Sequence, residues 1–82
     1  MSPRHLDVSM PHEIPVTSVQ ELGELVRRAR KDQKMTQETV SGLAGLGNRF
    51  IIDLEHGKET VQTQKVIDVL NLLGLELIVR KR

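Results

Sequence analysis

Residues 43–50, LAGLGNRF, hold two glycines around a single leucine and then resume with a polar and a cationic residue. Gly45 stands where a helix is expected to end in the left-handed conformation, which glycine adopts without strain. Leu46 is expected to fill the bend, and Gly47 takes the N-cap position of a new helical pattern. This stretch therefore predicts two short helices that meet at a tight three-residue turn.

A short helix is predicted on each side of this turn. Before it, Thr36 is placed to cap residues 37–44, QETVSGLA. The inward face of this helix is expected to be Val40, Leu43 and Ala44. After the turn comes NRFIIDLE, residues 48–55, whose shared apolar face is Ile51 and Leu54. This is the spacing of a helix-turn-helix, in which the second helix crosses the first and its opening residues project from the core. A generic helical hairpin has the same turn, so the turn alone leaves both readings open.

Amphipathic helices are also predicted before and after this pair. Ser18, with Glu21 three residues later, forms the pattern of a capping box for the first of them. Its apolar face is expected to be Leu22, Leu25, Val26 and Ala29. The last helix runs from about Gln62 to Leu73, with Gly74 as its stop. Its core residues are expected to be Val66, Val69, Leu70 and Leu73. The pattern therefore predicts an all-α domain of four to five helices.

The two ends of the chain differ from this helical centre. All three prolines lie in the first 16 residues, so residues 1–17 predict a flexible arm before the helical domain of residues 18–74. Residues 75–82, LELIVRKR, alternate with a period of two, which predicts a strand. A single strand leaves its amides and carbonyls unpaired, so we expect it to pair with the same strand of a second copy in a homodimer. The expected dimer contacts are Leu75, Leu77, Ile78 and Val79.

Composition favours binding over catalysis. A chain of 82 residues with 38% hydrophobic content forms one small domain and is too short to enclose a deep substrate cavity. There is no cysteine, and the three histidines are scattered, so we expect neither a metal site nor a cofactor. No spacing suggests a Ser, His and Asp set or a phosphate-cradling loop, so we expect no enzyme. There is no apolar run long enough for a membrane span and no signal peptide, which predicts a soluble, cytoplasmic protein without a membrane partner.

The distribution of charge points to a polyanion. Residues 27–34 carry five cations against one acid, although the formal net charge of the chain is only +1. Such a cluster is also compatible with an ordinary solvated helix end. Phe50 is the only aromatic residue, whereas modules for single-stranded nucleic acids stack bases on several aromatic rings. Phe50 is expected to be a packing residue, and duplex DNA is the better candidate partner.

Residues 28–58, RARKDQKMTQETVSGLAGLGNRFIIDLEHGK, resemble the DNA-binding region of the Xre or phage-repressor class of helix-turn-helix proteins. The residues that carry the resemblance are Arg30, Thr36, Gln37, Gly45, Leu54, Glu55, Gly57 and Lys58. It extends over residues 18–74. Within the class, the small size, the segment RFIIDLEHGK and the terminal LGLELIVRKR resemble the HipB antitoxins of toxin-antitoxin operons.

The resemblance implies roles for the matching positions. An ion pair is expected between Arg30 and Glu55. Phosphate contacts are expected from Arg30, Lys31, Lys34, Thr36, Gln37 and Lys58. Base contacts are expected at the start of the third helix, from Gly47, Asn48, Arg49 and Asp53. Arginine pairs bidentately with guanine and asparagine with adenine, which makes Arg49 the first candidate. Gly47 replaces the usual hydroxyl residue, and for Asp53 both acceptance from cytosine and simple repulsion of phosphates stay open.

These expectations predict a homodimeric repressor that places the third helix of each copy in successive major grooves of a palindromic operator, about 34 Å apart. Resemblance to HipB implies an antitoxin that represses its own operon and binds a kinase-like HipA toxin. One alternative is a stand-alone phage or host repressor of the Xre type. The other is a bridging domain that uses the same fold to contact proteins.

Overall fold

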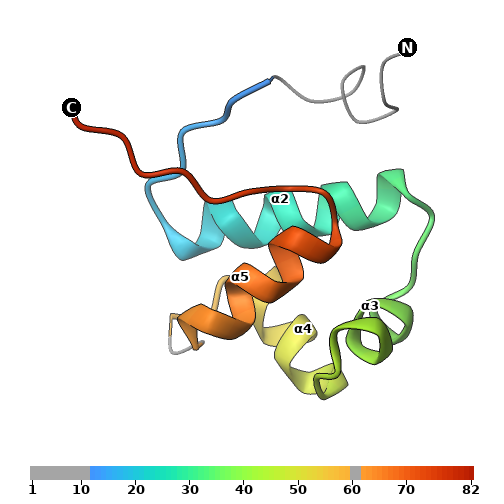
Figure 1. Ribbon diagram of the computed structural model, residues 1–82. Coiled ribbons are helices and arrows are strands. Elements are labelled where there is room, and N and C mark those ends of the chain that lie inside the picture. Colours follow the sequence, from blue (N-terminus) through green and yellow to red (C-terminus); the bar gives the residue numbers. More distant parts are fainter. Residues whose placement is uncertain (1–11, 60–61) are drawn as a thin grey trace, which may run out of the picture.

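The computed structural model describes residues 12–59 and 62–82. In these residues the secondary structure consists of four helices, labelled in Figure 1: α2 (Val19–Asp32), α3 (Gln37–Ala44), α4 (Asn48–Glu55) and α5 (Thr63–Leu72). The long helix α2 lies across the other three, and α3 and α4 follow each other on one side of it (Figure 1). The all-α architecture that we predicted is therefore confirmed for this part of the chain.

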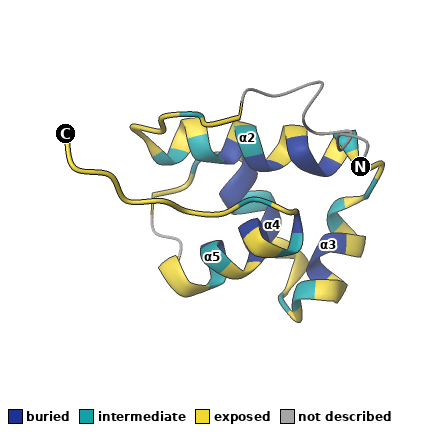
Figure 2. Cartoon of the chain, turned by 45° about the horizontal axis from the view of Figure 1, so that its top comes forward, coloured by how far each residue is buried: buried dark blue, intermediate teal, exposed yellow. Residues whose placement is uncertain are grey.

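One apolar core lies between the helices, and all four contribute to it (Figure 2). Its buried members are Val26, Ala29, Val40, Ile51, Leu54, Val66, Val69, Leu70 and Leu73. The predicted inward faces of α2, α4 and α5 are confirmed, with Leu22 and Leu25 packed at the edge of the core. Phe50 also packs there and is half-buried, as expected for a packing residue.

The inward face of α3 was predicted incorrectly at one position. Leu43 is 64% exposed, whereas Ser41 is buried with only 4% of its surface accessible. The two positions lie about 160° apart around a helix of 3.6 residues per turn, so α4 and α5 cannot cover both. Because α3 is only eight residues long, its few apolar positions do not define a unique face.

The helix α2 begins at the predicted cap, but its second capping hydrogen bond differs from the prediction. The backbone N–H of Glu21 donates to Oγ of Ser18 at 3.0 Å, which satisfies one free amide of the first turn. In a capping box the glutamate would accept from the N–H of the cap residue itself. Here its carboxylate accepts from the N–H and the hydroxyl of Thr17, one residue earlier. These hydrogen bonds, the backbone one above all, hold the pKa of Glu21 below its ordinary value of 4.5.

Two glycines allow α2 to approach the end of α4 closely. A Cβ added at Gly23 would lie 2.2 Å from the carbonyl oxygen of Leu54 and 2.9 Å from that of Glu55. A Cβ added at Gly57, where φ is +78°, would lie 2.7 Å from Cα of Gln20. Because these obstacles are backbone atoms, a side chain at either glycine would force the two segments apart.

The last segment of the chain leaves α5 and returns over the beginning of α2 (Figure 1). Gly74, with φ of +81°, makes the turn that was predicted after α5. Leu77 then lines a hollow of about 200 Å³ together with Val19 and Leu22 of α2. The C-terminal segment therefore packs against the first turns of α2.

The strand that we predicted over residues 75–82 is not formed within the described single chain. Leu77 and Ile78 are exposed to nearly the same extent, 56% and 54%, so the segment has no alternation of a buried and an open face. An ion pair between Arg80 and Glu13 joins it to the N-terminal segment, of which residues 1–11 lie outside the described residues. An extended segment becomes a strand only through hydrogen bonds to a neighbouring strand, which this fold does not supply among the described residues.

Candidate nucleic-acid interface

The corner between α3 and α4 has the geometry expected of the two glycines. Gly45 ends α3 in the left-handed conformation, with φ of 70° and ψ of 30°. The N–H of Leu46 donates back to the carbonyl of Ser41 at 2.9 Å, which closes the last turn of α3. Gly47 has extended angles, φ −71° and ψ 149°, and α4 starts directly after it. The chain therefore turns sharply over residues 45–47, and the predicted turn is confirmed.

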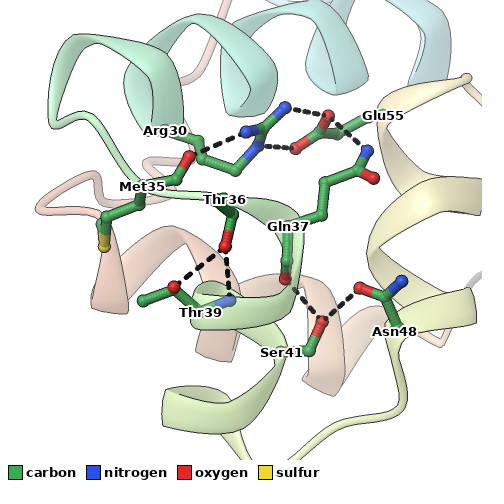
Figure 3. Close-up of polar contacts among 8 residues, drawn as sticks. All are labelled: Arg30, Met35, Thr36, Gln37, Thr39, Ser41, Asn48 and Glu55. Carbon is green, nitrogen blue, oxygen red and sulfur yellow. Dashed lines mark hydrogen bonds and ion pairs between the residues drawn. The ribbon is translucent and has the colours of Figure 1, made fainter.

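A buried ion pair joins α2 to the end of α4. Nε of Arg30 lies 2.7 Å from Oε2 of Glu55, and a terminal nitrogen of Arg30 donates to Oε1 at 3.0 Å (Figure 3). A third guanidinium N–H donates to the carbonyl of Met35 at 2.8 Å, and Nε2 of Gln37 donates to Oε1 of Glu55 at 3.1 Å. The two charged side chains are only 9% and 2% exposed. The pair therefore holds the end of α4 against α2. Removal of either partner would leave the other charge buried without a counter-charge.

A second polar contact joins α3 to the start of α4. Oγ of the buried Ser41 lies 2.7 Å from the carbonyl oxygen of Gln37 and 3.1 Å from Oδ1 of Asn48 (Figure 3). A hydroxyl carries a single proton, so Ser41 donates to one of these two oxygens at a time. Asn48 is exposed and directs its amide nitrogen away from Ser41 (Figure 3). Ser41 therefore orients the side chain of Asn48 through its amide oxygen, and the amide nitrogen stays accessible.

Charged side chains surround the exposed face of α4. Arg49, in the first turn, has 80% of its side chain exposed, and its Nε lies 3.3 Å from Oδ1 of Asp53. The other oxygen of Asp53, Oδ2, lies 3.6 Å from Nζ of Lys58. The side chain of Asp53 is only 19% exposed, so it lies deeper than either cation. The outermost charges of this face are therefore positive.

The residues predicted to contact phosphate differ in their exposure. The exposed members are Lys31, Lys34, Thr36 and Lys58. The hydroxyl of Thr36 accepts from the N–H of Thr39 at 3.0 Å and so caps α3. Gln37 is half-buried, and Arg30 is buried in its ion pair. Of the five cations between residues 27 and 34, one therefore serves the interior, and the surface cluster is smaller than the sequence indicated.

Three structurally important residues were not predicted as such from the sequence. Gly23 permits the contact between α2 and α4, and Ser41 orients Asn48. Gln33 donates from Nε2 to the carbonyl of Leu73 at 2.8 Å and ties the end of α2 to the end of α5. An isolated glycine within an amphipathic helical pattern is a signal that could have identified Gly23. A hydrogen bond between residues 40 positions apart, such as that of Gln33, has no local signature.

Within residues 12–59 and 62–82, no group of three or more histidine, aspartate or glutamate side chains is arranged to hold a metal ion. The buried side-chain polar atoms of this part of the chain all have hydrogen-bond partners. None of its helices combines the length and the apolar character needed to cross a membrane.

Comparison with known proteins places this geometry in a family. Residues 23–78 match the helix-turn-helix domain family. The chain is 49% identical over 57 residues to an uncharacterized HTH-type transcriptional regulator, y4mF, of Sinorhizobium fredii. These residues make up 70% of this chain and 75% of that protein. Its fold is similar to a chain in the structure of a HipA-HipB-O2-O3 complex and to a chain in the structure of an MDT protein. Each superposes with a TM-score of 0.77 at 16% identity, over 84% of this chain and 97% of the other.

Proposed function

The chain belongs to the helix-turn-helix domain family of DNA-binding transcriptional regulators, which are not enzymes. We propose that it is a repressor that reads duplex DNA with the start of α4. The observation that carries this proposal is the position of Arg49. Its side chain is 80% exposed directly after the corner, while Ile51 and Leu54 of the same helix are completely buried. A helix anchored on one face and open at its first turn has the form of a helix that enters the major groove.

We assign the reading of bases to exposed groups at this first turn. Arg49 is suited to guanine, and Asn48 to adenine. Gly47 is exposed, and apart from its two chain neighbours no heavy atom of the described residues lies within 4 Å of the place where its Cβ would be, so the backbone can approach the DNA closely there. These three positions are the proposed base-reading set.

Phosphate contacts come from residues around this set. Lys31, Lys34 and Lys58 are exposed cations, and Thr36 and Gln37 begin α3, whose first-turn amides favour an anion. Gln37 donates one amide proton to Glu55, so its second amide proton remains for a phosphate oxygen. Glu55, held by Arg30, thereby orients the amide of Gln37 toward a phosphate. Arg30 thus has an indirect part in positioning the DNA.

The proposed repressor is a homodimer in the cytoplasm. Val79 is 94% exposed, and Leu77 and Ile78 are half-exposed, so the C-terminal segment presents apolar surface. Beyond the N–H of Leu75, which donates to the carbonyl of Leu70, its backbone makes no hydrogen bond to other backbone groups of the described residues. Pairing of residues 75–82 between two copies would cover both, and a two-fold dimer would match a palindromic operator. A chain truncated before Leu75 is expected to be monomeric in analytical ultracentrifugation. A dimer of the truncated chain would contradict this interface.

We further propose that the repressor is an antitoxin of the HipB type, which binds a kinase-like toxin. Support comes from the C-terminal sequence and from the fold shared with a chain of a HipA-HipB complex. Purification of the tagged chain expressed from its native operon is expected to yield a kinase-like protein in stoichiometric amount. Recovery of the chain alone, with no kinase-like gene beside its own, favours a stand-alone repressor.

The DNA-reading proposal is tested with the segment upstream of the chain's own gene. Footprinting defines the bound site, and titrations against that site and an unrelated duplex are repeated at several salt concentrations. Arg49→Ala is expected to weaken specific binding about 5- to 150-fold for each half-site and to change binding to the unrelated duplex little. Lys31→Ala is expected to weaken both and to reduce the salt slope by about 1 per copy.

Two results would overturn the proposal. An unchanged operator preference in Arg49→Ala would remove Arg49 from the base-reading set. No salt-dependent affinity for any duplex would favour the bridging domain that contacts proteins.

A further inference from the structure

We propose that Asp53 is a positioning residue: it holds the guanidinium of Arg49 ready for a guanine and does not itself contact a base. This proposal rests on the proposed function, because it concerns how the same α4 surface reads DNA. It replaces the two roles that the sequence left open for Asp53, acceptance from cytosine and repulsion of phosphates, with a third.

The geometry of the pair supports positioning. Arg49 and Asp53 are four residues apart on α4, a spacing that places two side chains on the same helix face. The shortest contact between the two side chains joins Oδ1 of Asp53 to Nε of Arg49 at 3.3 Å, and among the described residues the terminal nitrogens of Arg49 make no hydrogen bond, so they are available to a ligand. A fork of two donors is what the O6 and N7 acceptors of guanine require. The exposed fractions, 80% for Arg49 and 19% for Asp53, place the fork farther from the protein than the carboxylate that holds it.

Lys58 makes a direct base contact by Asp53 unfavourable. Oδ1 of Asp53 faces Arg49, and Oδ2 faces Nζ of Lys58 at 3.6 Å, so each carboxylate oxygen already has a cation. A donor from cytosine would have to share an oxygen that already faces a cation, on a side chain that is only 19% exposed. The three charges sum to +1, so the group as a whole attracts phosphates although it contains a carboxylate.

The expected benefit is reduced disorder of a long side chain. A free arginine side chain loses rotamer freedom when it binds, and a contact that restricts the free protein lowers that loss. We expect a factor of about 3 to 10 in operator affinity for each half-site from this cause.

The test uses Asp53→Asn, which keeps the shape of the side chain and removes its charge. Affinity for the operator is expected to fall about 3- to 10-fold per half-site, whereas affinity for an unrelated duplex rises because the protein gains positive charge. Asp68→Asn is the matched control, because it makes the same chemical change at an exposed position of α5, outside the helix-turn-helix. We expect the control to leave the preference for the operator unchanged.

A double variant separates positioning from the two other roles. In the background of Arg49→Ala, Asp53→Asn is expected to cause no further loss of operator affinity, because there is no longer a guanidinium to hold. An equal loss with and without Arg49 would show that Asp53 reads a base itself. A gain in affinity for the operator and the unrelated duplex alike would show that Asp53 only repels phosphates.

A measurement without DNA keeps this inference distinct from the proposed function. The ¹⁵N relaxation of Nε of Arg49 in the full chain is expected to give a higher order parameter in the wild type than in Asp53→Asn. Equal order parameters would overturn the positioning role, even if the chain binds its operator. Failure of the wild type to bind any duplex, with the difference in order parameter present, would overturn the proposed function and leave the ion pair established.

Discussion

A methyl group added at two different helical glycines is expected to change stability in opposite directions. In Gly23→Ala the new Cβ would lie 2.2 Å from the carbonyl oxygen of Leu54, whereas real Cβ atoms essentially never approach another atom within 3.0 Å. The backbones of α2 and α4 must therefore separate by at least 0.8 Å, the difference between these two distances. At Gly42, in α3, the described residues place no heavy atom within 4 Å of the added Cβ, apart from the chain neighbours of Gly42 and the nearby backbone of its own helix.

The two magnitudes follow from strain and helix propensity. Overpacking that moves the backbone costs about 1 to 3 kcal/mol, and we expect the upper end because a carbonyl group cannot rotate away as a side chain can. Alanine has an advantage of about 1 kcal/mol over glycine inside a helix. Gly23→Ala should therefore lose about 2 kcal/mol of unfolding free energy, which lowers the Tm by about 8 to 16 °C. Gly42→Ala should gain up to about 1 kcal/mol and raise the Tm by about 4 to 8 °C.

Urea and thermal denaturation, followed by circular dichroism, measure both variants. All samples need the same protein concentration, because the proposed dimerisation would make the Tm depend on it. Comparison of urea midpoints is valid while the slope of unfolding free energy with urea is unchanged. A Gly23→Ala variant as stable as the wild type would refute the close contact of α2 with α4. A loss of stability in Gly42→Ala would refute the open surface around α3.

Three further predictions concern the ion pair, the cap of α4 and the start of α2. Glu55→Gln leaves Arg30 buried without a counter-charge, so urea denaturation should show a loss of about 3 kcal/mol, and a loss below 1 kcal/mol would argue against a buried pair. Gly47→Ser should stabilise by about 0.5 to 1 kcal/mol in thermal denaturation, because this position has ordinary φ and free space for a capping hydroxyl, whereas a lower Tm would show that glycine is required there. Glu21→Gln should be less stable than the wild type at pH 7. That difference should disappear as the pH falls from 4.5 through the lowered pKa of Glu21, because a carboxylate with a depressed pKa stabilises the fold only when ionised, and a difference that persists at pH 2 would contradict this cause.

The sequence by itself determined the helices and the corner between α3 and α4. Helix periodicity places Val26 and Ala29, or Val66 and Val69, on one face through spacing alone. The left-handed conformation at Gly45 is likewise a local requirement of the chain. Both are properties of neighbouring residues, so they can be predicted before the fold is known. The prediction that Leu43 faces the core was wrong because eight residues provide too little periodicity to orient α3.

Only the tertiary structure decided which groups of the candidate interface are exposed and which are buried. Arg30 and Glu55 are 25 residues apart, and the family resemblance implied their ion pair, but only the fold shows that the pair is buried, which removes one cation from the surface cluster. Gly23 is necessary for a reason that likewise lies in the tertiary structure, because a Cβ at this position would collide with the backbone of another helix, α4. Even the C-terminal segment, whose alternation predicts a strand, needs hydrogen bonds from a second strand to become one. These outcomes depend on distances between atoms far apart in the chain, and no local pattern of residues encodes them.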